Sequence, residues 1–356
     1  MAHNFDTTPE QQAGQLHFLK SQIIETKAPV LKRKDADLSG QTAIVTGGNI
    51  GVGLEVGRQL LQLGVSKLIL AVRNEEGGNK AAEMLLAPRK DGPQKVEVWK
   101  LDLSEYASVT AFAERVGKLD KRPDIVVLNA GVLSAKLGLN PSTGHDVDIQ
   151  TNYLSTVLLL VLLLPIAKSK PSGATAVKNP VPHLSVVSSV MAHWTKFEER
   201  NTEPLLPAFD SEDPARFDME ERYSVSKLLA LMFLAELARR IPADVAVLNA
   251  PTPGMTRGSG FMRQSAGTIL GYVINIYYRI FGHTCDVGAS QVMAAAVKAG
   301  PDSHGHFIEN GKKRPLPVIM YTPEGERVTK QLWKETMQEL SFAGVEQIIN
   351  DLSISK

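Results

Sequence analysis

The sequence has one cysteine, almost no net charge and no apolar run long enough to cross a membrane. Cys285 cannot form an internal disulfide, and a single free thiol suits a reducing compartment. The 39 basic and 38 acidic residues give a formal charge of +1, which leaves no electrostatic footprint for nucleic acid. Val157 to Leu164 is strongly apolar but far too short for a transmembrane segment. The first residues lack the basic and then apolar pattern of a secretory signal, so we expect a cytoplasmic protein with small-molecule partners.

Metal-ligand spacing is missing as well. The eight histidines include His304 and His306 near a glycine, but no cluster has the spacing of a metal site, and we expect no metal. The 356 residues, 43% hydrophobic and 22% charged, suffice for one large α/β domain with elaborations and a sizeable core.

The rest of the chain is organised around Ile44 to Gly53, with the sequence IVTGGNIGVG. Apolar residues lead into four glycines, and Leu54 to Gln62 then has an amphipathic helical pattern, which predicts a strand, a tight turn and a helix. Glycine permits positive φ and close approach of a ligand, and the start of the helix offers unpaired N–H groups to a pyrophosphate. A dinucleotide is therefore the leading ligand, although the spacing differs from GxGxxG and many glycine-rich turns bind nothing.

Strand and helix patterns alternate from Thr42 onward. We expect strands over 42–47, 67–72, 96–101, 124–129 and 183–188, and helices over 52–63, 76–86, 108–117 and 146–166. This alternation predicts a doubly wound, Rossmann-type α/β fold, a parallel sheet of about seven strands with helices on both faces. Ligands should bind beyond the carboxyl ends of the strands. Met1 to Leu38 is interpreted as a leader over the domain, and Lys168 to Pro182 as a solvated loop.

Polar residues stand at the predicted strand ends. Arg73 follows the second strand, where an NAD enzyme would carry an acidic residue for the ribose 2′-hydroxyl. Arginine can instead clamp a 2′-phosphate, so the sequence favours NADP(H) over NAD(H). Asp102 after the third strand is either an N-cap for the next helix or an acceptor for adenine. Asn129 to Gly131 would let the backbone approach the cofactor.

A tyrosine and a lysine four residues apart form the most informative pair. Tyr223 and Lys227 in YSVSK would share one helix face, with the ammonium near the phenol. A nearby positive charge favours the phenolate, which makes Tyr223 a plausible general acid for a carbonyl. The alternative is a solvated helix face. Ser188 and Ser189 at the end of the fifth strand, with Asn152 in the preceding long helix, favour the catalytic interpretation.

Together these residues resemble the short-chain dehydrogenase/reductase family over roughly Gly40 to Asn310. The matching motifs are TGGNIGVG for TGxxxGxG, Asp102, LNAG for NNAG, Asn152, Ser189, YxxxK at Tyr223 and Lys227, and Pro253-Gly254 after the sixth strand. The resemblance implies the residues that bind the cofactor: Gly47, Asn49, Ile50, Gly51, Gly53, Arg73, Asp102, Asn129, Ala130, Gly131, Lys227, Pro253, Gly254 and Thr256.

The resemblance also implies a catalytic tetrad. Tyr223 would exchange the proton, and Lys227 would lower its pKa and hold the nicotinamide ribose. Ser189 would orient the carbonyl, and Asn152 would keep a water in the proton relay. Ser189 is chosen over Ser188 because the second serine at this strand end is usually the catalytic one in the family.

The chain departs from the family pattern in three places. Leu128 replaces the first Asn of NNAG, and Ala192 to Glu221 is an insertion that we expect to border the active site. A C-terminal extension follows Gly311. The long insertion, the SSVMAHW string and the C-terminal extension resemble the retinol-dehydrogenase-like branch and fungal reductases of secondary metabolism. The expected organisation is a leader over 1–38, a Rossmann-fold domain over 39–312 with substrate-lid insertions near 192–221 and 255–285, and a helical extension over 313–356.

Substrate choice is expected to depend on Thr252 to Asp286. Within it, Ile269 to Phe281 is aromatic and aliphatic, which suits a lid over a lipophilic, polycyclic or polyketide-like substrate. The same residues would also suit a lid that only packs on the domain, or a surface anchor in a membrane interface. Trp194 and Phe197 are candidate pocket residues.

Two helices carry a hint about assembly. Leu154 to Leu164 and Leu228 to Leu237 are apolar nearly all round, so each should be covered on more than one face. In the family these helices often form a four-helix dimer interface. The alternatives are thus a homodimer and a monomer in which Glu324 to Leu340 covers one of them.

The resulting prediction is a reductase that moves hydride between NADPH and a ketone or aldehyde, or the reverse, on a lipophilic polyketide- or terpenoid-type intermediate. The protein would then supply positioning and a proton. The alternatives are a retinal or fatty-aldehyde reductase, and a protein that senses NADP(H) without turnover.

Overall fold

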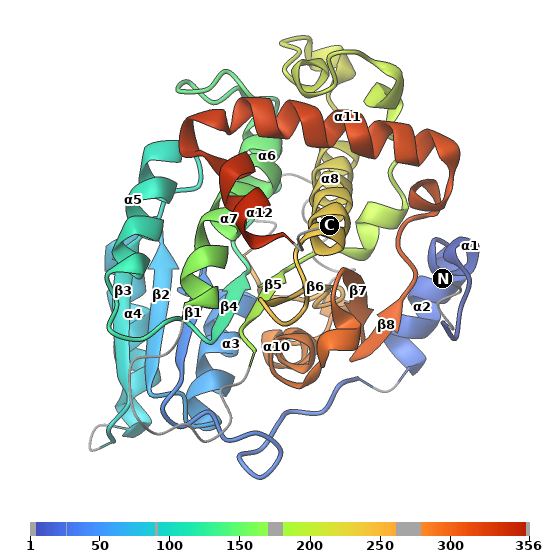
Figure 1. Ribbon diagram of the computed structural model, residues 1–356. Helices are drawn as coiled ribbons and strands as arrows, with labels where there is room; N and C mark the ends of the chain where they lie inside the picture. The colour runs from blue at the N-terminus through green and yellow to red at the C-terminus, as the bar shows by residue number, and fades with distance from the viewer. Residues whose placement is uncertain (1–4, 26, 90–91, 170–180, 261–278, 354–356) are drawn as a thin grey trace.

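The computed structural model describes residues 5–25, 27–89, 92–169, 181–260 and 279–353. Within them an eight-stranded sheet lies between two layers of helices (Figure 1). The spatial order is β3-β2-β1-β4-β5-β6-β7-β8, and β1 to β7 are parallel. The strands are β1 (Thr42–Thr46), β2 (Lys67–Val72), β3 (Lys95–Lys100), β4 (Ile125–Leu128), β5 (His183–Val186), β6 (Val247–Pro251), β7 (His306–Glu309) and β8 (Lys312–Arg314). The doubly wound fold is therefore confirmed, and its order reverses between β1 and β4, where such sheets bind ligands.

An eighth, antiparallel strand extends the sheet beyond the predicted number. β8 is short and charged and has no apolar alternation, so its residues give no strand signal. It forms because Asn310 and Gly311 both take positive φ, 52° and 74°, as a two-residue hairpin turn requires. The turn brings Arg314 opposite Phe307 in the sheet.

Helices cover both faces of the sheet. One face carries α3 (Gly51–Gln62), α4 (Glu75–Leu86), α10 (Cys285–Met293) and η9 (Ala294–Lys298), and the other carries α5 (Tyr106–Gly117), α6 (Val147–Ile149), η3 (Gln150–Leu154), α7 (Ser155–Lys168) and α8 (Met219–Arg240). Short turns complete the connections: η2 (Ala87–Arg89), η4 (Val190–His193), η5 (Glu198–Asn201), η6 (Leu206–Phe209), η7 (Pro214–Arg216), η10 (Pro301–Ser303), η11 (Val318–Tyr321) and η12 (Ser341–Ala343). The predicted helix boundaries hold to within two residues for α3, α4 and α5.

The long central helix is continuous from Val147 to Lys168. It is the one helix of the described residues that is long and apolar enough to span a membrane, but 83% of its most apolar stretch is buried inside the protein. A core helix explains this apolarity. A π-helical segment, η3, interrupts the α-helical ladder and contains Asn152.

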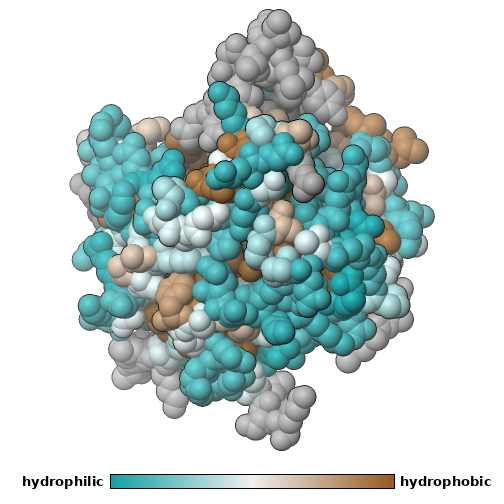
Figure 2. Space-filling view, turned by 90° about the horizontal axis from the view of Figure 1, so that it is seen from above, coloured by the Kyte–Doolittle hydropathy of each residue, from teal (hydrophilic) through white to brown (hydrophobic). Residues whose placement is uncertain are grey.

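The C-terminal extension covers the apolar helices that could have formed a dimer. α11 (Pro323–Glu339) packs on α8, where Trp333 stacks on Phe233 with ring centroids 5.0 Å apart, and α12 (Val345–Leu352) packs on α7 (Figure 1). The surface on the side of α11 is mostly hydrophilic (Figure 2). The helices therefore find their cover within the chain, as the monomeric alternative requires, and a homodimer remains a prediction that needs another surface.

The leader is helical, with α1 (Pro9–Gln12), α2 (Gln15–Leu19) and η1 (Lys20–Ile24), and lies beside β8 (Figure 1). The predicted solvated loop within 168–182 and the predicted lid over 269–281 lie largely outside the described residues.

Candidate active site

The glycine-rich turn joins β1 to α3 at the point where the strand order reverses. Gly47 and Gly51 take positive φ, 64° and 60°. A Cβ atom on Gly53 would lie 2.5 Å from the Gly47 oxygen and 2.6 Å from Asn129 Nδ2, so no other residue fits there. Ile50 provides no side-chain cap, which leaves the first N–H groups of α3 available to an anion. A dinucleotide pyrophosphate therefore fits this turn.

The end of β4 is bonded directly to the end of β1. Asn129 Nδ2 donates to the Thr46 carbonyl at 3.0 Å, and the Ala130 N–H donates to Thr46 Oγ1 at 2.9 Å. A Cβ atom on Gly47 would lie 3.1 Å from Ala130 Cα. The predicted residues Asn129 and Ala130 thus form one wall of the glycine-rich turn.

Two exposed cationic residues stand at the ends of β2 and β3, and the side chain of one bonds the main chain of the other. Arg73 is exposed, and Lys100 Nζ donates to its carbonyl oxygen at 2.7 Å. Asp102 is not the N-cap of α5, because that position is Glu105. Asp102 Oδ1 instead accepts the N–H and hydroxyl of Ser104 at 3.0 and 2.7 Å, which fixes the turn after β3. The N-cap alternative is therefore wrong.

Tyr223 and Lys227 lie on one face of α8, as their spacing predicts. Asp218 starts this helix, since its Oδ1 accepts the N–H groups of Glu220 and Glu221 at 2.9 and 3.0 Å. Lys227 Nζ lies 5.7 Å from the centroid of the Tyr223 ring and donates to the Val187 carbonyl at 2.9 Å.

Both side chains are buried, and the charge of the lysine is costly. Tyr223 is 6% and Lys227 7% exposed. Burial lowers the pKa of Lys227 to about 8, and the carboxylate of Asp148 partly opposes this shift. Burial in turn raises the pKa of Asp148 to about 6. A buried acid and a buried base therefore share this end of α8 and α6.

Asn152 connects the loop after β4 to α8. Its Nδ2 donates to the Val132 carbonyl at 2.9 Å and to Ser226 Oγ at 3.0 Å, and its Oδ1 accepts the Val132 N–H at 2.8 Å. A Cβ atom on Gly131 would lie 3.0 Å from Asn152 Oδ1 and 3.5 Å from Lys227 Nζ. The structure thus brings Gly131, Asn152 and Lys227 to one place.

The two candidate serines differ in environment. Ser189 is partly exposed, and its Oγ accepts the Met191 N–H at 3.2 Å, which caps η4, and η4 packs against α8. Ser188 is 5% exposed, and its hydroxyl has no hydrogen-bond partner among the described residues. Ser189 stays the predicted substrate contact, with Ser188 as the alternative.

The turn after β6 lies over the glycine-rich turn. Gly254 takes a φ of 69°, and Thr256 Oγ1 donates to the carbonyl oxygens of Pro253 and Gly254 at 3.3 and 3.2 Å. A Cβ atom on Gly51 would lie 2.5 Å from the Ser259 carbonyl oxygen. This turn therefore packs directly on the glycine-rich turn at Gly51.

The insertion packs differently from the sequence-based expectation. Phe197 is 1% exposed and stacks on Phe209 with ring centroids 6.4 Å apart, so it is a core residue and not a pocket residue. Trp194 makes an edge contact with Phe18 of the leader at 5.0 Å. Glu335 of α11 accepts the N–H groups of Leu205 and Leu206, both at 2.8 Å, and so ties the insertion to the C-terminal extension.

Comparison with known proteins identifies the family. Residues 41–177 match the short chain dehydrogenase family. The chain is 43% identical to the short-chain dehydrogenase fogG of Aspergillus ruber over 355 residues, which cover 99% of this chain and 100% of that one. It is 40% identical to the short chain dehydrogenase/reductase mfmJ of Annulohypoxylon moriforme, over 89% of this chain and 90% of that one.

The chain is a short-chain dehydrogenase/reductase. It is therefore an NAD(P)-dependent oxidoreductase, as predicted.

Solved structures agree with the fold. An uncharacterized protein from Mycobacterium Paratuberculosis superposes with a TM-score of 0.59 at 26% identity, covering 87% of this chain and 97% of that one. The Pseudomonas aeruginosa RhlG/NADP active-site complex has a TM-score of 0.55 at 22% identity, over 76% of this chain and 95% of that one, and shares the fold alone.

Sequence reasoning missed three polar residues of this short-chain dehydrogenase/reductase site. Ser226 stands inside the quoted YSVSK, three residues after Tyr223, and Asp148 stands four residues before Asn152, so helical spacing contained both signals. Lys100 ends β3 beside Arg73, and only the pairing of β2 with β3 brings the two together. Among the described residues, no group of three metal-ligating side chains occurs.

Proposed function

We propose that the protein is an NADP(H)-dependent reductase of ketones or aldehydes on lipophilic substrates, working in either direction. The observation that carries the proposal is the junction of Asn152 and Lys227 at Gly131, beside Tyr223 and beyond the strand ends. These side chains meet next to the glycine-rich turn, where a dinucleotide fits.

The proton chemistry follows from the buried ammonium. Bound NADP(H) would supply or accept the hydride. Tyr223 donates its phenolic proton to the carbonyl oxygen during reduction, and the positive charge of Lys227 beside the ring stabilises the phenolate that remains. Ser189 is proposed to hold the same oxygen by a hydrogen bond. Asn152 keeps the loop after β4 and α8 at a fixed separation through its three hydrogen bonds.

The preference for NADP(H) is supported by the two cations at the ends of β2 and β3. Arg73 and Lys100 are both exposed, and the lysine ammonium lies 2.7 Å from the arginine carbonyl. A guanidinium and an ammonium at the ribose end of the site would neutralise a 2′-phosphate. NAD(H) carries no 2′-phosphate with which either cation could pair.

The lipophilic substrate class is supported by the sequence and by the relatives. Ile269 to Phe281, largely outside the described residues, is rich in aromatic and aliphatic residues. The relatives fogG and mfmJ come from fungi. We therefore propose a polyketide- or terpenoid-type biosynthetic intermediate as substrate, with retinal and fatty aldehydes as the competing class.

A substrate panel tests the proposal. Purified protein is titrated with NADPH and NADH by fluorescence, and then lipophilic ketones, quinones, retinal and long-chain aldehydes are scored by loss of reduced-cofactor absorbance. Tighter binding of NADPH together with turnover of polycyclic ketones is the expected result. Turnover of retinal or aldehydes alone would favour the competing class. Binding without any turnover would favour a sensing role and count against the enzyme.

A further inference from the structure

The leader makes a buried contact with the turn that completes the cofactor site. Gln22 of η1 is 3% exposed, and its side chain faces Met255, two residues after Pro253. Gln22 Nε2 donates to the Met255 carbonyl at 3.0 Å, and Gln22 Oε1 accepts the Met255 N–H at 3.1 Å. The amide therefore pairs with both backbone groups of one residue, as a neighbouring strand would.

The same amide also reaches the chain where it returns toward α10. Gln22 Nε2 donates to the Phe281 carbonyl at 3.0 Å. The segment at 255–257 also pairs with the segment at 281–283. The His283 N–H donates to the Met255 carbonyl at 2.9 Å, and the Arg257 N–H donates to the His283 carbonyl at 2.8 Å. Gln22 is thus bonded to both of these segments, at Met255 and at Phe281.

The position of Met255 affects how the 253–260 turn packs on the glycine-rich turn. Gly254 is close to the glutamine, since a Cβ atom there would lie 3.0 Å from Gln22 Oε1. Four residues after Met255, the Ser259 backbone packs on Gly51, leaving no room for a side chain at that glycine. A shift of Met255 would therefore change the distance between the Ser259 backbone and Gly51, the first residue of α3.

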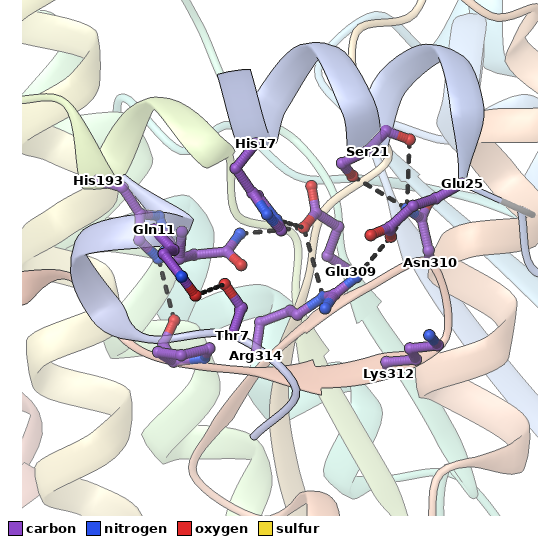
Figure 3. Close-up of polar contacts among 12 residues, drawn as sticks. Thr7, Gln11, His17, Ser21, Glu25, His193, Glu309, Asn310, Lys312 and Arg314 are labelled. Atoms are coloured by element: carbon purple, nitrogen blue, oxygen red, sulfur yellow. Dashed lines mark hydrogen bonds and ion pairs between the residues drawn. The ribbon is translucent and has the colours of Figure 1, made fainter. Parts of the chain in front are cut away.

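The leader is held firmly enough to serve as an anchor. Figure 3 shows its polar contacts with the β7–β8 hairpin. Arg314, 1% exposed, forms ion pairs with Asp6 and Glu25 of the leader. Burial alone would raise the pKa of Glu309, but the His17 ring 3.5 Å away and a hydrogen bond from Gln12 keep it at about 2.

A second set of contacts fixes the register of the leader next to Gln22. Asn310 Nδ2 donates to Ser21 Oγ at 3.0 Å and to Glu25 Oε2 at 3.1 Å (Figure 3). Ser21 directly precedes Gln22 in η1, and Glu25 is the C-cap residue of η1. The helix is therefore pinned to the sheet through residues adjacent in sequence or one turn away.

From these contacts we infer that Gln22 is a positioning residue for cofactor binding: the leader holds the 253–260 turn in place over the glycine-rich turn. The inference rests on the proposed use of NADP(H). Among the described residues the Gln22 side chain bonds Met255 and Phe281 and not α8, so it should govern affinity for the cofactor more than the chemical step.

The test compares Gln22→Met with Gln15→Met, the same change at an exposed position of α2 in the same leader. NADPH dissociation constants are measured by fluorescence on the full chain, with kcat at saturating NADPH and hydrogen exchange of peptides covering 252–260. For Gln22→Met we expect about a tenfold weaker NADPH affinity, kcat within about threefold of wild type and faster exchange in that segment. Gln15→Met should match the wild type in all three.

Three results would overturn the inference. The first is a folded Gln22→Met protein whose NADPH affinity stays within twofold of wild type, even if its melting temperature falls. The second is a loss of kcat without a loss of affinity. If Gln22→Met does not fold, Gln22→Glu keeps the acceptor for the Met255 N–H and removes both donors. An unchanged affinity in that variant is the third.

Failure of the proposed function is distinguishable from failure of this inference. If the wild-type protein binds neither NADPH nor NADH, the proposed function is refuted. Hydrogen exchange then decides the positioning role alone: faster exchange of 252–260 in Gln22→Met supports it, and unchanged exchange rejects it.

Discussion

Replacing Lys227 by methionine should abolish turnover and at the same time stabilise the nucleotide-free fold at neutral pH. Burial holds the pKa of this lysine at about 8, against an ordinary value of 10.5. Because the unfolded chain binds the proton more tightly, the difference costs the folded state about 3 kcal/mol when the lysine is charged. Methionine has a similar volume and carries no charge to bury.

The lost hydrogen bond works in the opposite direction. Lys227 Nζ donates to the Val187 carbonyl at 2.9 Å, and leaving that buried oxygen without a partner costs about 1–2 kcal/mol. The net gain in the free energy of unfolding at pH 7 is therefore about 1–2 kcal/mol. Turnover is lost because no ammonium remains beside the Tyr223 ring.

The pH dependence of stability separates the cost of the buried charge from the cost of the lost hydrogen bond. Below the folded pKa of about 8 the full cost of the buried charge is present, and it disappears as pH rises toward the unfolded value of 10.5. The advantage of Lys227→Met should thus be constant from pH 7 to 8 and fall by about 3 kcal/mol by pH 10.5. At pH 10.5 the variant should be the less stable protein, because only the lost hydrogen bond remains.

Urea denaturation of both proteins at pH 7 and pH 10 provides the measurement. Lys118→Met, at an exposed position after α5, is the matched control and should show no such pH-dependent gain. A stability difference between Lys227→Met and wild type that does not change with pH would refute the account of a buried, costly charge. A variant that keeps turnover would refute the catalytic role of the ammonium.

Two further substitutions test the cofactor and the tetrad. Arg73→Asp should weaken NADPH binding about 10- to 100-fold and change NADH affinity by no more than about threefold, because only NADPH would lose a charge-assisted contact with its 2′-phosphate. Two fluorescence titrations measure both affinities. Equal losses would remove the reason for preferring NADP(H). Ser226→Ala removes the hydrogen bond at 3.0 Å to Asn152, and kcat should fall about fivefold with unchanged NADPH affinity. A wild-type kcat for this variant in steady-state kinetics would show that Ser226 does not position Asn152.

Local patterns were sufficient to predict most of the sheet and the residues that meet at its edge. β2 was predicted over its observed range, and the spacing of Tyr223 and Lys227 placed both on one helix face. Both inferences depend on the short repeat of side-chain directions, about 2 residues in a strand and about 3.6 in a helix. The glycines of the first turn are likewise fixed by local φ and by contacts with the neighbouring strand end.

Features that depend on distant partners could not be predicted in the same way. β8 consists of charged residues and exists because the Asn310-Gly311 turn folds it back on β7. The leader has only a partial helical pattern, and the importance of Gln22 appears only when Met255 and Phe281 are beside it. A glutamine in a polar sequence carries no signal of its own burial.

The C-terminal extension shows the limit of an argument from apolarity alone. The leucine-rich faces of α7 and α8 require cover, but a second copy and a later segment of the same chain satisfy that requirement equally. α11 and α12 provide the cover here. This cover comes from contacts between residues far apart in the sequence, such as Phe233 and Trp333, which are one hundred residues apart.

The most direct test of the central claim compares Tyr223→Phe with the wild type in one preparation. The substitution removes a single hydroxyl from a side chain that is 6% exposed, so the fold and the cofactor site should be unchanged. We predict that NADPH affinity stays within twofold and that reduction of any panel substrate falls at least a thousandfold, since no other group donates the proton. A Tyr223→Phe protein that reduces the same substrate at the wild-type rate would contradict the account.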